Sequence, residues 1–234
     1  MTTERRKKSR RGQEIIEFGL VAVLYVPLLT GGFVVGMNLI RSIECNQTCR
    51  DLTDMFIHGA DFSTYQYQQL AQKLAGGLNL QIGSSFSGNE QSNTGNSGNG
   101  LVTVTEIMYV GTTSGAQCQS VAPATCTNAN SFVYLSQVQF GNSSLANSNT
   151  VTLGTCPSAV MNSAGIVQNP ITASQAQVGS SGQSAMSSLW QSGSNGTTAL
   201  TDGQTVYIVE TYFQSPDLSI GSFAGNGVYA RYFF

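Results

Sequence analysis

The feature that most constrains this chain is an apolar run from Phe18 to Ile40 that contains no charged residue. As an α-helix the run would be roughly 35 Å long, which is enough to cross the hydrocarbon core of a membrane. It is longer than the apolar part of a secretory signal peptide, and no small-residue cleavage site follows it. We therefore expect residues 13–58 to form a retained transmembrane helix with an extension beyond the membrane.

The charge before this run predicts its orientation. Six of the ten Lys and Arg residues precede Gly12: Arg5, Arg6, Lys7, Lys8, Arg10 and Arg11. Because Lys and Arg stay on the cytoplasmic side of a membrane helix, residues 1–12 should form a basic leader peptide and the rest of the chain should be exported. A short basic segment could instead bind nucleic acid. The adjacent helix already explains the charge, so we expect no nucleic-acid partner.

Beyond the helix, the composition is that of an exported domain. Only 9% of all residues are charged, against about 25% in ordinary soluble domains. Cleavage after Gly12 would leave four basic and eleven acidic residues, a net charge of −7. Disorder is the alternative for a chain rich in Gly, Ser and Asn. The apolar strands described below favour a folded extracytoplasmic domain over residues 59–234.

Two residues of the helix bear on assembly. Pro27 should kink the helix locally, because its ring removes one backbone hydrogen bond. Glu17 places a carboxylate at the start of the apolar run, where it is costly unless it is solvated at the membrane surface or paired. Cleavage between Gly12 and Gln13 would create a cationic α-amino group one helical turn from Glu17. Glu17 of one subunit could then pair with the amine of its neighbour and set the register of a helical bundle.

The segment RRGQEIIEFGLV, which contains the expected cleavage point, resembles the processing site of type IV prepilin-like proteins. The form Gly-Gln-x-x-x-Glu-Phe is most similar to the TadE-like and TadG-like pseudopilins of the tight-adherence (Tad) pilus. Phe18 stands where the main Tad pilin usually has Tyr, as it does in many TadE-like chains, and the long second part also favours a TadE-like pseudopilin. The resemblance implies cleavage by a prepilin peptidase between Gly12 and Gln13, with Glu17 and Phe18 in the processing motif.

The same resemblance implies a structural function. The chain would be a minor subunit or initiator of a Tad-type pilus, held in the bacterial inner membrane with an extracytoplasmic C-terminal domain, or carried on a cell-surface filament. Its partners would be other pilin or pseudopilin subunits, through helix packing that involves Glu17 and Pro27. It would be no enzyme and would need no cofactor. The alternatives are the major subunit of a pilus filament and a single-pass membrane-anchored domain that binds a surface polymer.

The residues after the apolar run predict two helices. Cys45, Cys49, Leu52 and Phe56 fall on one stripe of a continued helix, which should be buried and should end at Gly59. A second helix should then follow. Its expected capping box is Ser63–Gln66, its apolar stripe is Tyr67, Leu70 and Leu74, and its stop is Gly76–Gly77.

The rest of the chain predicts a sheet. Four segments rich in β-branched and aromatic residues read as strands, at 101–110, 132–140, 205–213 and 228–234. Residues 83–100 have the composition of a loop. Residues 141–204 form a polar insert with a brief helix at 185–190. The predicted fold class is α+β: a long N-terminal transmembrane helix followed by a small antiparallel-sheet, pilin-like domain.

The remaining polar residues offer little chemistry. Cys118 and Cys126 could form a disulfide in an oxidising compartment, or Cys156 could pair with either of them. With one His in the chain, we expect neither a catalytic triad nor a metal site. Glu106 and Glu210 lie on predicted strands, where alternation favours exposure to solvent over a catalytic carboxylate pair.

Overall fold

A computed structural model describes residues 4–82, 86–87, 90–91, 98–121, 125–147, 150–190, 201–214 and 227–234. The chain divides into two compact units, Met1–Arg41 and Ser42–Phe234. Helix α1 (Glu4–Ile57) supplies the first unit and continues into the second. The predicted α+β class is confirmed, because a long apolar helix precedes a four-stranded antiparallel sheet.

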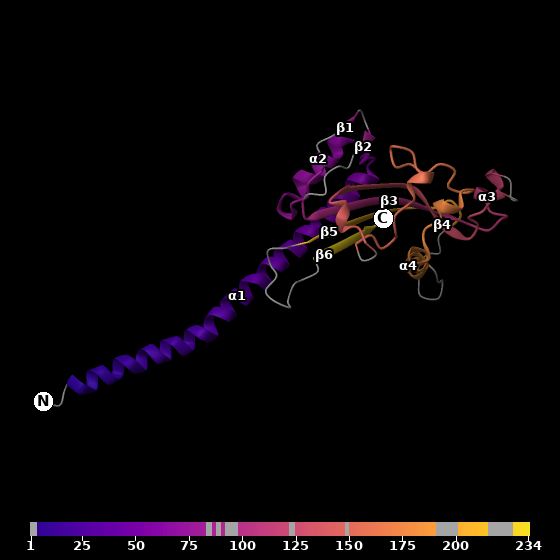
Figure 1. Cartoon of the computed structure of the whole chain (residues 1–234). Helices are drawn as coiled ribbons and strands as arrows, with labels where there is room; N and C mark the ends of the chain where they lie inside the picture. Colours follow the sequence, from indigo (N-terminus) through magenta and orange to yellow (C-terminus); the bar gives the residue numbers. More distant parts are fainter. Residues whose placement is uncertain are drawn as a thin grey trace. The chain divides into compact units, whose positions relative to one another are not determined.

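The sheet of the second unit has the strand order β4-β3-β5-β6, with every neighbouring pair antiparallel (Figure 1). Its strands are β3 (Gly100–Val110), β4 (Ser131–Gly141), β5 (Thr205–Phe213) and β6 (Val228–Phe233). Each strand begins and ends within one residue of the prediction, which is therefore confirmed. A β-bulge interrupts the pairing of β3 with β4: Glu106 faces Ser136, whereas the next residue, Ile107, faces Tyr134.

One face of the sheet packs against the second half of α1. Cys45, Cys49 and Leu52 are at most 1% exposed and contact strand residues such as Val104 and Val209. Three residues of the predicted stripe are thus buried as expected, and the fourth, Phe56, is half-buried and packs against the same core. Gly59 ends the helix in a left-handed conformation, with φ +87°. The amides of Gly59 and Ala60 donate to the carbonyls of Phe56 and Met55, so the last turn is closed by a Schellman motif.

The opposite face of the sheet is covered by the long insert. Leu153, Val178 and Met186 are at most 2% exposed and form a second core with Ile107 and Ile208. The insert contains α4 (Ser180–Trp190), which is longer than the predicted 185–190 helix. The few apolar residues of this polar segment therefore complete a two-sided core, which their spacing in the sequence did not indicate.

Helix α2 (Tyr65–Leu74) is present, but two details of its prediction are wrong. The Ser63 hydroxyl donates to Asp61 Oδ1 at 2.6 Å, and Thr64 caps the helix without a side-chain hydrogen bond, so no capping box forms. The buried face carries Gln68 and Ala71, not the apolar stripe. The amide of Gln68 donates to the Phe62 carbonyl at 2.8 Å, which satisfies this buried polar group. The predicted stripe, Tyr67, Leu70 and Leu74, is between 37% and 43% exposed.

The remaining described elements are short. Two paired strands, β1 (Phe86–Ser87) and β2 (Glu90–Gln91), lie within the predicted 83–100 loop. Residues 83–85, 88–89 and 92–97 of that loop lie outside the described residues. Helix α3 (Ala116–Ser120) connects β3 to β4. Single 3-10 turns occur at η1 (Gly76–Leu78), η3 (Ser143–Leu145), η4 (Ser158–Val160) and η5 (Ser174–Ala176).

Candidate functional site: the exposed apolar helix

The first unit exposes a continuous apolar surface. Most of its large apolar residues between Ile15 and Ile40 keep 57% to 76% of their surface accessible, as in Phe18, Val23 and Leu28, whereas Val34 and Met37 are half-buried. Exposed apolar surface of this extent marks a site for membrane or for other helices, since covering it contributes roughly 25 cal/mol per Å². By length and composition, the helix over Gly12–Ile57 can cross a membrane.

The four predicted processing residues all lie within α1, and all are exposed: Gly12, Gln13, Glu17 and Phe18. Residues 13 and 17 are one helical turn apart and therefore lie on the same side of the helix. A Cβ atom added at Gly12 would meet no atom within 4 Å, so the backbone at the expected cleavage point is open. The cleavage itself, and the pairing of Glu17 with a neighbouring amine, stay predictions.

Pro27 lies inside α1, and the helix continues through it. The ring removes the backbone donor that would bond the carbonyl of Val23. One turn later, the Thr30 hydroxyl donates to the carbonyl of Val26 at 2.9 Å and to that of Pro27 at 3.2 Å. This arrangement satisfies the hydroxyl within an apolar run. The local kink and the part of Pro27 in assembly stay predictions.

In the second unit, two thiols hold the continuing helix against the sheet. Cys45 Sγ lies 3.3 Å from Thr211 Oγ1, and Cys49 Sγ donates to the Val209 carbonyl at 3.2 Å. Burial raises the pKa of Cys49 to about 12. Cys49 is therefore a neutral thiol at neutral pH, which suits a small buried packing residue and makes a nucleophilic role unfavourable.

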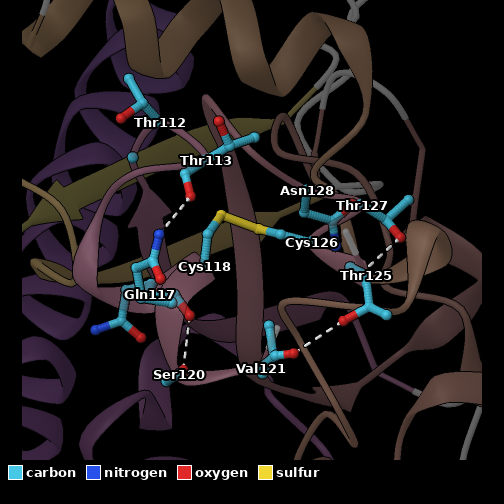
Figure 2. Close-up of a disulfide and its surroundings, with 12 residues drawn as sticks. Thr112, Thr113, Gln117, Cys118, Ser120, Val121, Thr125, Cys126, Thr127 and Asn128 are labelled. Atoms are coloured by element: carbon cyan, nitrogen blue, oxygen red, sulfur yellow. Dashed lines mark hydrogen bonds between the residues drawn. A yellow bond between two sulfur atoms is a disulfide. The ribbon is translucent and has the colours of Figure 1, made fainter. Parts of the chain in front are cut away.

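Cys118 and Cys126 form a disulfide, so one of the predicted pairings is confirmed (Figure 2). Cys118 is fully buried within α3, in the connection between β3 and β4. Around the bridge, the Ser120 hydroxyl donates to the Gln117 carbonyl at 2.6 Å, as Figure 2 shows. The disulfide thus joins two described segments whose hydroxyls at Ser120 and Thr125 donate to carbonyls within four residues.

The other predicted pairings are wrong, because Cys156 is a free thiol that is 1% exposed. It packs in the core on the insert side of the sheet. Its backbone amide donates to Gln137 Oε1 at 2.7 Å. Burial raises the pKa of this thiol to about 11.

The structure also places a buried polar cluster around Glu210 that the sequence did not reveal. Glu210 is 1% exposed, so the prediction that it faces solvent is wrong. Its Oε1 accepts hydrogen bonds from the Thr152 amide at 3.0 Å and from the Tyr229 hydroxyl at 2.6 Å. Arg231, opposite Glu210 on β6, donates to the Thr152 hydroxyl at 2.6 Å. The pairing of β5 with β6 and the fold of the insert, which supplies Thr152, together bring these side chains into contact.

Glu106 and Glu210 do not form a carboxylate pair. In the register of β3 and β5, Glu210 faces Thr103. Thr103 and Glu106 are three positions apart on β3, so their side chains point to opposite faces of the strand. Since alternate residues of a strand point to opposite faces, the two carboxylates lie on opposite sides of the sheet. Across the described residues, no group of three or more His, Cys, Asp and Glu residues is arranged to hold a metal ion.

Comparison of the chain with family models, with curated proteins and with solved structures finds no match. The resemblance to TadE-like pseudopilins therefore depends on the residues around Gly12 and on the order of helix and sheet.

Proposed function

We propose that the chain is a TadE-like pseudopilin: a structural minor subunit or initiator of a Tad-type pilus, without enzymatic activity. The observation that supports this most is the exposed surface of α1. Most of its large apolar side chains from Ile15 to Ile40 are more than half exposed, and the prepilin-like motif around Gly12 lies at the start of the same surface. A surface of this kind suits a helix that first lies in lipid and later packs against identical or related helices.

In this proposal the basic leader stays in the cytoplasm and the second unit lies outside the inner membrane. A prepilin peptidase removes residues 1–12 and leaves an α-amino group on Gln13. Glu17 of one subunit then pairs with the Gln13 amine of the next. An unpaired charge in an apolar bundle is costly, so only the register that joins the two groups is favourable.

The test compares Glu17→Gln with Glu14→Gln in cells that make the pilus. Both residues are exposed acidic residues at the start of α1, so the second variant controls for the loss of one negative charge. We expect Glu17→Gln to lower the amount of this protein in sheared filaments at least tenfold and Glu14→Gln to leave it unchanged. Equal incorporation of both variants would contradict the role of Glu17 in setting the register and would leave the helix with the role of a membrane anchor alone.

A further inference from the structure

The second unit contains a pocket of about 380 Å³ that none of the preceding roles uses. It lies next to the β-bulge and to the loop between α1 and α2. Bulges often redirect side chains beside binding sites. We name it the Glu106 pocket; its lining residues are Phe56, Asp61, Phe62, Ser63, Val104, Glu106, Leu135, Ser136, Val138, Ala164, Ile166 and Val167.

The Glu106 pocket combines apolar walls with two carboxylates. Glu106 accepts a hydrogen bond from the Ser136 hydroxyl at 3.5 Å, and Asp61 accepts from the amide and the hydroxyl of Ser63 at 2.9 and 2.6 Å. Burial and the nearby Glu106 carboxylate raise the pKa of Tyr207. None of the residues that line the pocket carries a positive charge. Its chemistry therefore fits a cation carried on an apolar stem.

The exposed face of α2 presents such a group. Lys73 is the only lysine after residue 12 and is exposed. Leu70 and Leu74, which lie within one turn of it, are 43% and 41% exposed. The other cations of the second unit fit less well: Arg231 is bonded to Thr152, and Arg50 lines a different pocket together with Asp51 and Asp54.

Lys73 lies at the end of α2 that is far from the pocket of its own chain. Ser63, at the start of α2, lines the pocket, and the ring of Phe62 contacts that of Phe56. At the other end, a Cβ atom added at Gly77 would collide with the carboxylate of Glu44. Helix α2 therefore runs back along α1, and the rise from Tyr65 to Lys73 is about 12 Å.

We propose that Lys73, with Leu70 and Leu74 beside it, docks into the Glu106 pocket of a second copy of this chain. The contact joins two different surfaces, so it is heterologous, and it displaces the second copy along α2. A heterologous contact that does not close on itself generates an open filament. This docking rests on the proposed function, because a pilus is the assembly in which two copies of the chain would meet. It adds the contact that joins the second unit of one copy to the second unit of the next.

The test uses the full chain in the producing cells. A photo-crosslinking amino acid replaces Leu70, and peptide mass spectrometry identifies the crosslinked residues of the second copy. We expect crosslinks to the segment around Ile166, which is 50% exposed and lines the pocket. Lys73→Glu should lower the crosslink yield at least tenfold, and Lys73→Gln should also lower it. Arg50→Glu, which reverses another exposed cation, should leave the yield unchanged.

Charge reversal supplies the decisive comparison. Combining Lys73→Glu with Asp61→Lys should restore part of the crosslink yield, because a cation then replaces one of the two carboxylates that line the pocket. Equal losses from Lys73→Glu and Arg50→Glu would overturn the proposal, as would crosslinks only to other surfaces. So would a pocket that binds free butylammonium while copies form no crosslink. A crosslink that forms without cleavage at Gly12 would support the docking and contradict the pseudopilin proposal. Filaments that assemble without the crosslink would support the pseudopilin proposal and contradict the docking.

Discussion

The thiol of Cys49 donates a hydrogen bond to the carbonyl oxygen of Val209 at 3.2 Å, and so joins α1 to the centre of the sheet. The two residues are 160 positions apart in the chain. The second half of α1 is therefore part of the core of the second unit, while the first half exposes its apolar side chains. The same helix is therefore exposed along its first half and packed into a protein core along its second half.

The first prediction concerns this shared core. Leu52 is fully buried between α1 and the sheet, so Leu52→Ala should lower the free energy of unfolding by about 2–5 kcal/mol. Ile43→Ala, on the exposed side of the same helix, should change it by less than about 0.5 kcal/mol. Chemical denaturation of the purified chain in detergent measures both. Equal effects would mean that α1 is not part of the folded core.

The disulfide gives a second prediction. Cys118 and Cys126 are eight residues apart, and closing a loop of this size stabilises a fold by about 2–3 kcal/mol in the chain-entropy model. The double variant Cys118→Ser with Cys126→Ser should therefore unfold at a lower denaturant concentration than the oxidised protein. A reducing agent should bring the unchanged protein to a similar midpoint. An unfolding midpoint that is unchanged by the double substitution and by the reducing agent would show that the disulfide adds no stability.

The third prediction is a loss of stability at alkaline pH. Burial raises the pKa of Cys156 to about 11 and also raises the pKa values of Tyr134 and Tyr229. Between the ordinary and the raised pKa, each group ionises only in the unfolded chain. Stability is therefore full below about pH 9 and should fall above it by about 1.4 kcal/mol per pH unit for each ionising group.

Denaturation between pH 7 and pH 10.5 measures this slope. Replacing Cys156 by Ala removes one contributing group, so the variant should lose stability less steeply than the unchanged protein above pH 9. A stability that stays constant up to pH 10.5 would contradict the burial of these groups.

The buried polar cluster around Glu210 gives a fourth prediction. Tyr229→Phe removes one donor to Glu210 and leaves the apolar ring in place. Hydrogen bonds to charged groups contribute about 1.5–3 kcal/mol, so unfolding at pH 7 should become easier by about that amount. Tyr232→Phe, on the same strand but 43% exposed, should have little effect. Similar values for the two variants would show that the Tyr229 hydroxyl contributes nothing to the cluster.

The sequence predicted the strands well because their residues alternate and are β-branched, and it predicted the stripe of α1 because Cys45, Cys49 and Leu52 repeat at helical spacing. It failed on α2, where the satisfied amide of Gln68 replaced the expected apolar stripe at the buried face. It also failed on Glu210, whose partners come from separate segments that only the fold brings together. Local periodicity carries no information about such long-range polar contacts.

The intact mass of the protein purified from membranes tests the central claim most directly. The pseudopilin account predicts a chain that begins at Gln13, because cleavage after Gly12 creates the amine that pairs with Glu17. The mass should therefore correspond to residues 13–234, with the Cys118–Cys126 disulfide intact. A mass that includes residues 1–12 would contradict prepilin-type processing and would leave a domain held in the membrane by an uncut helix.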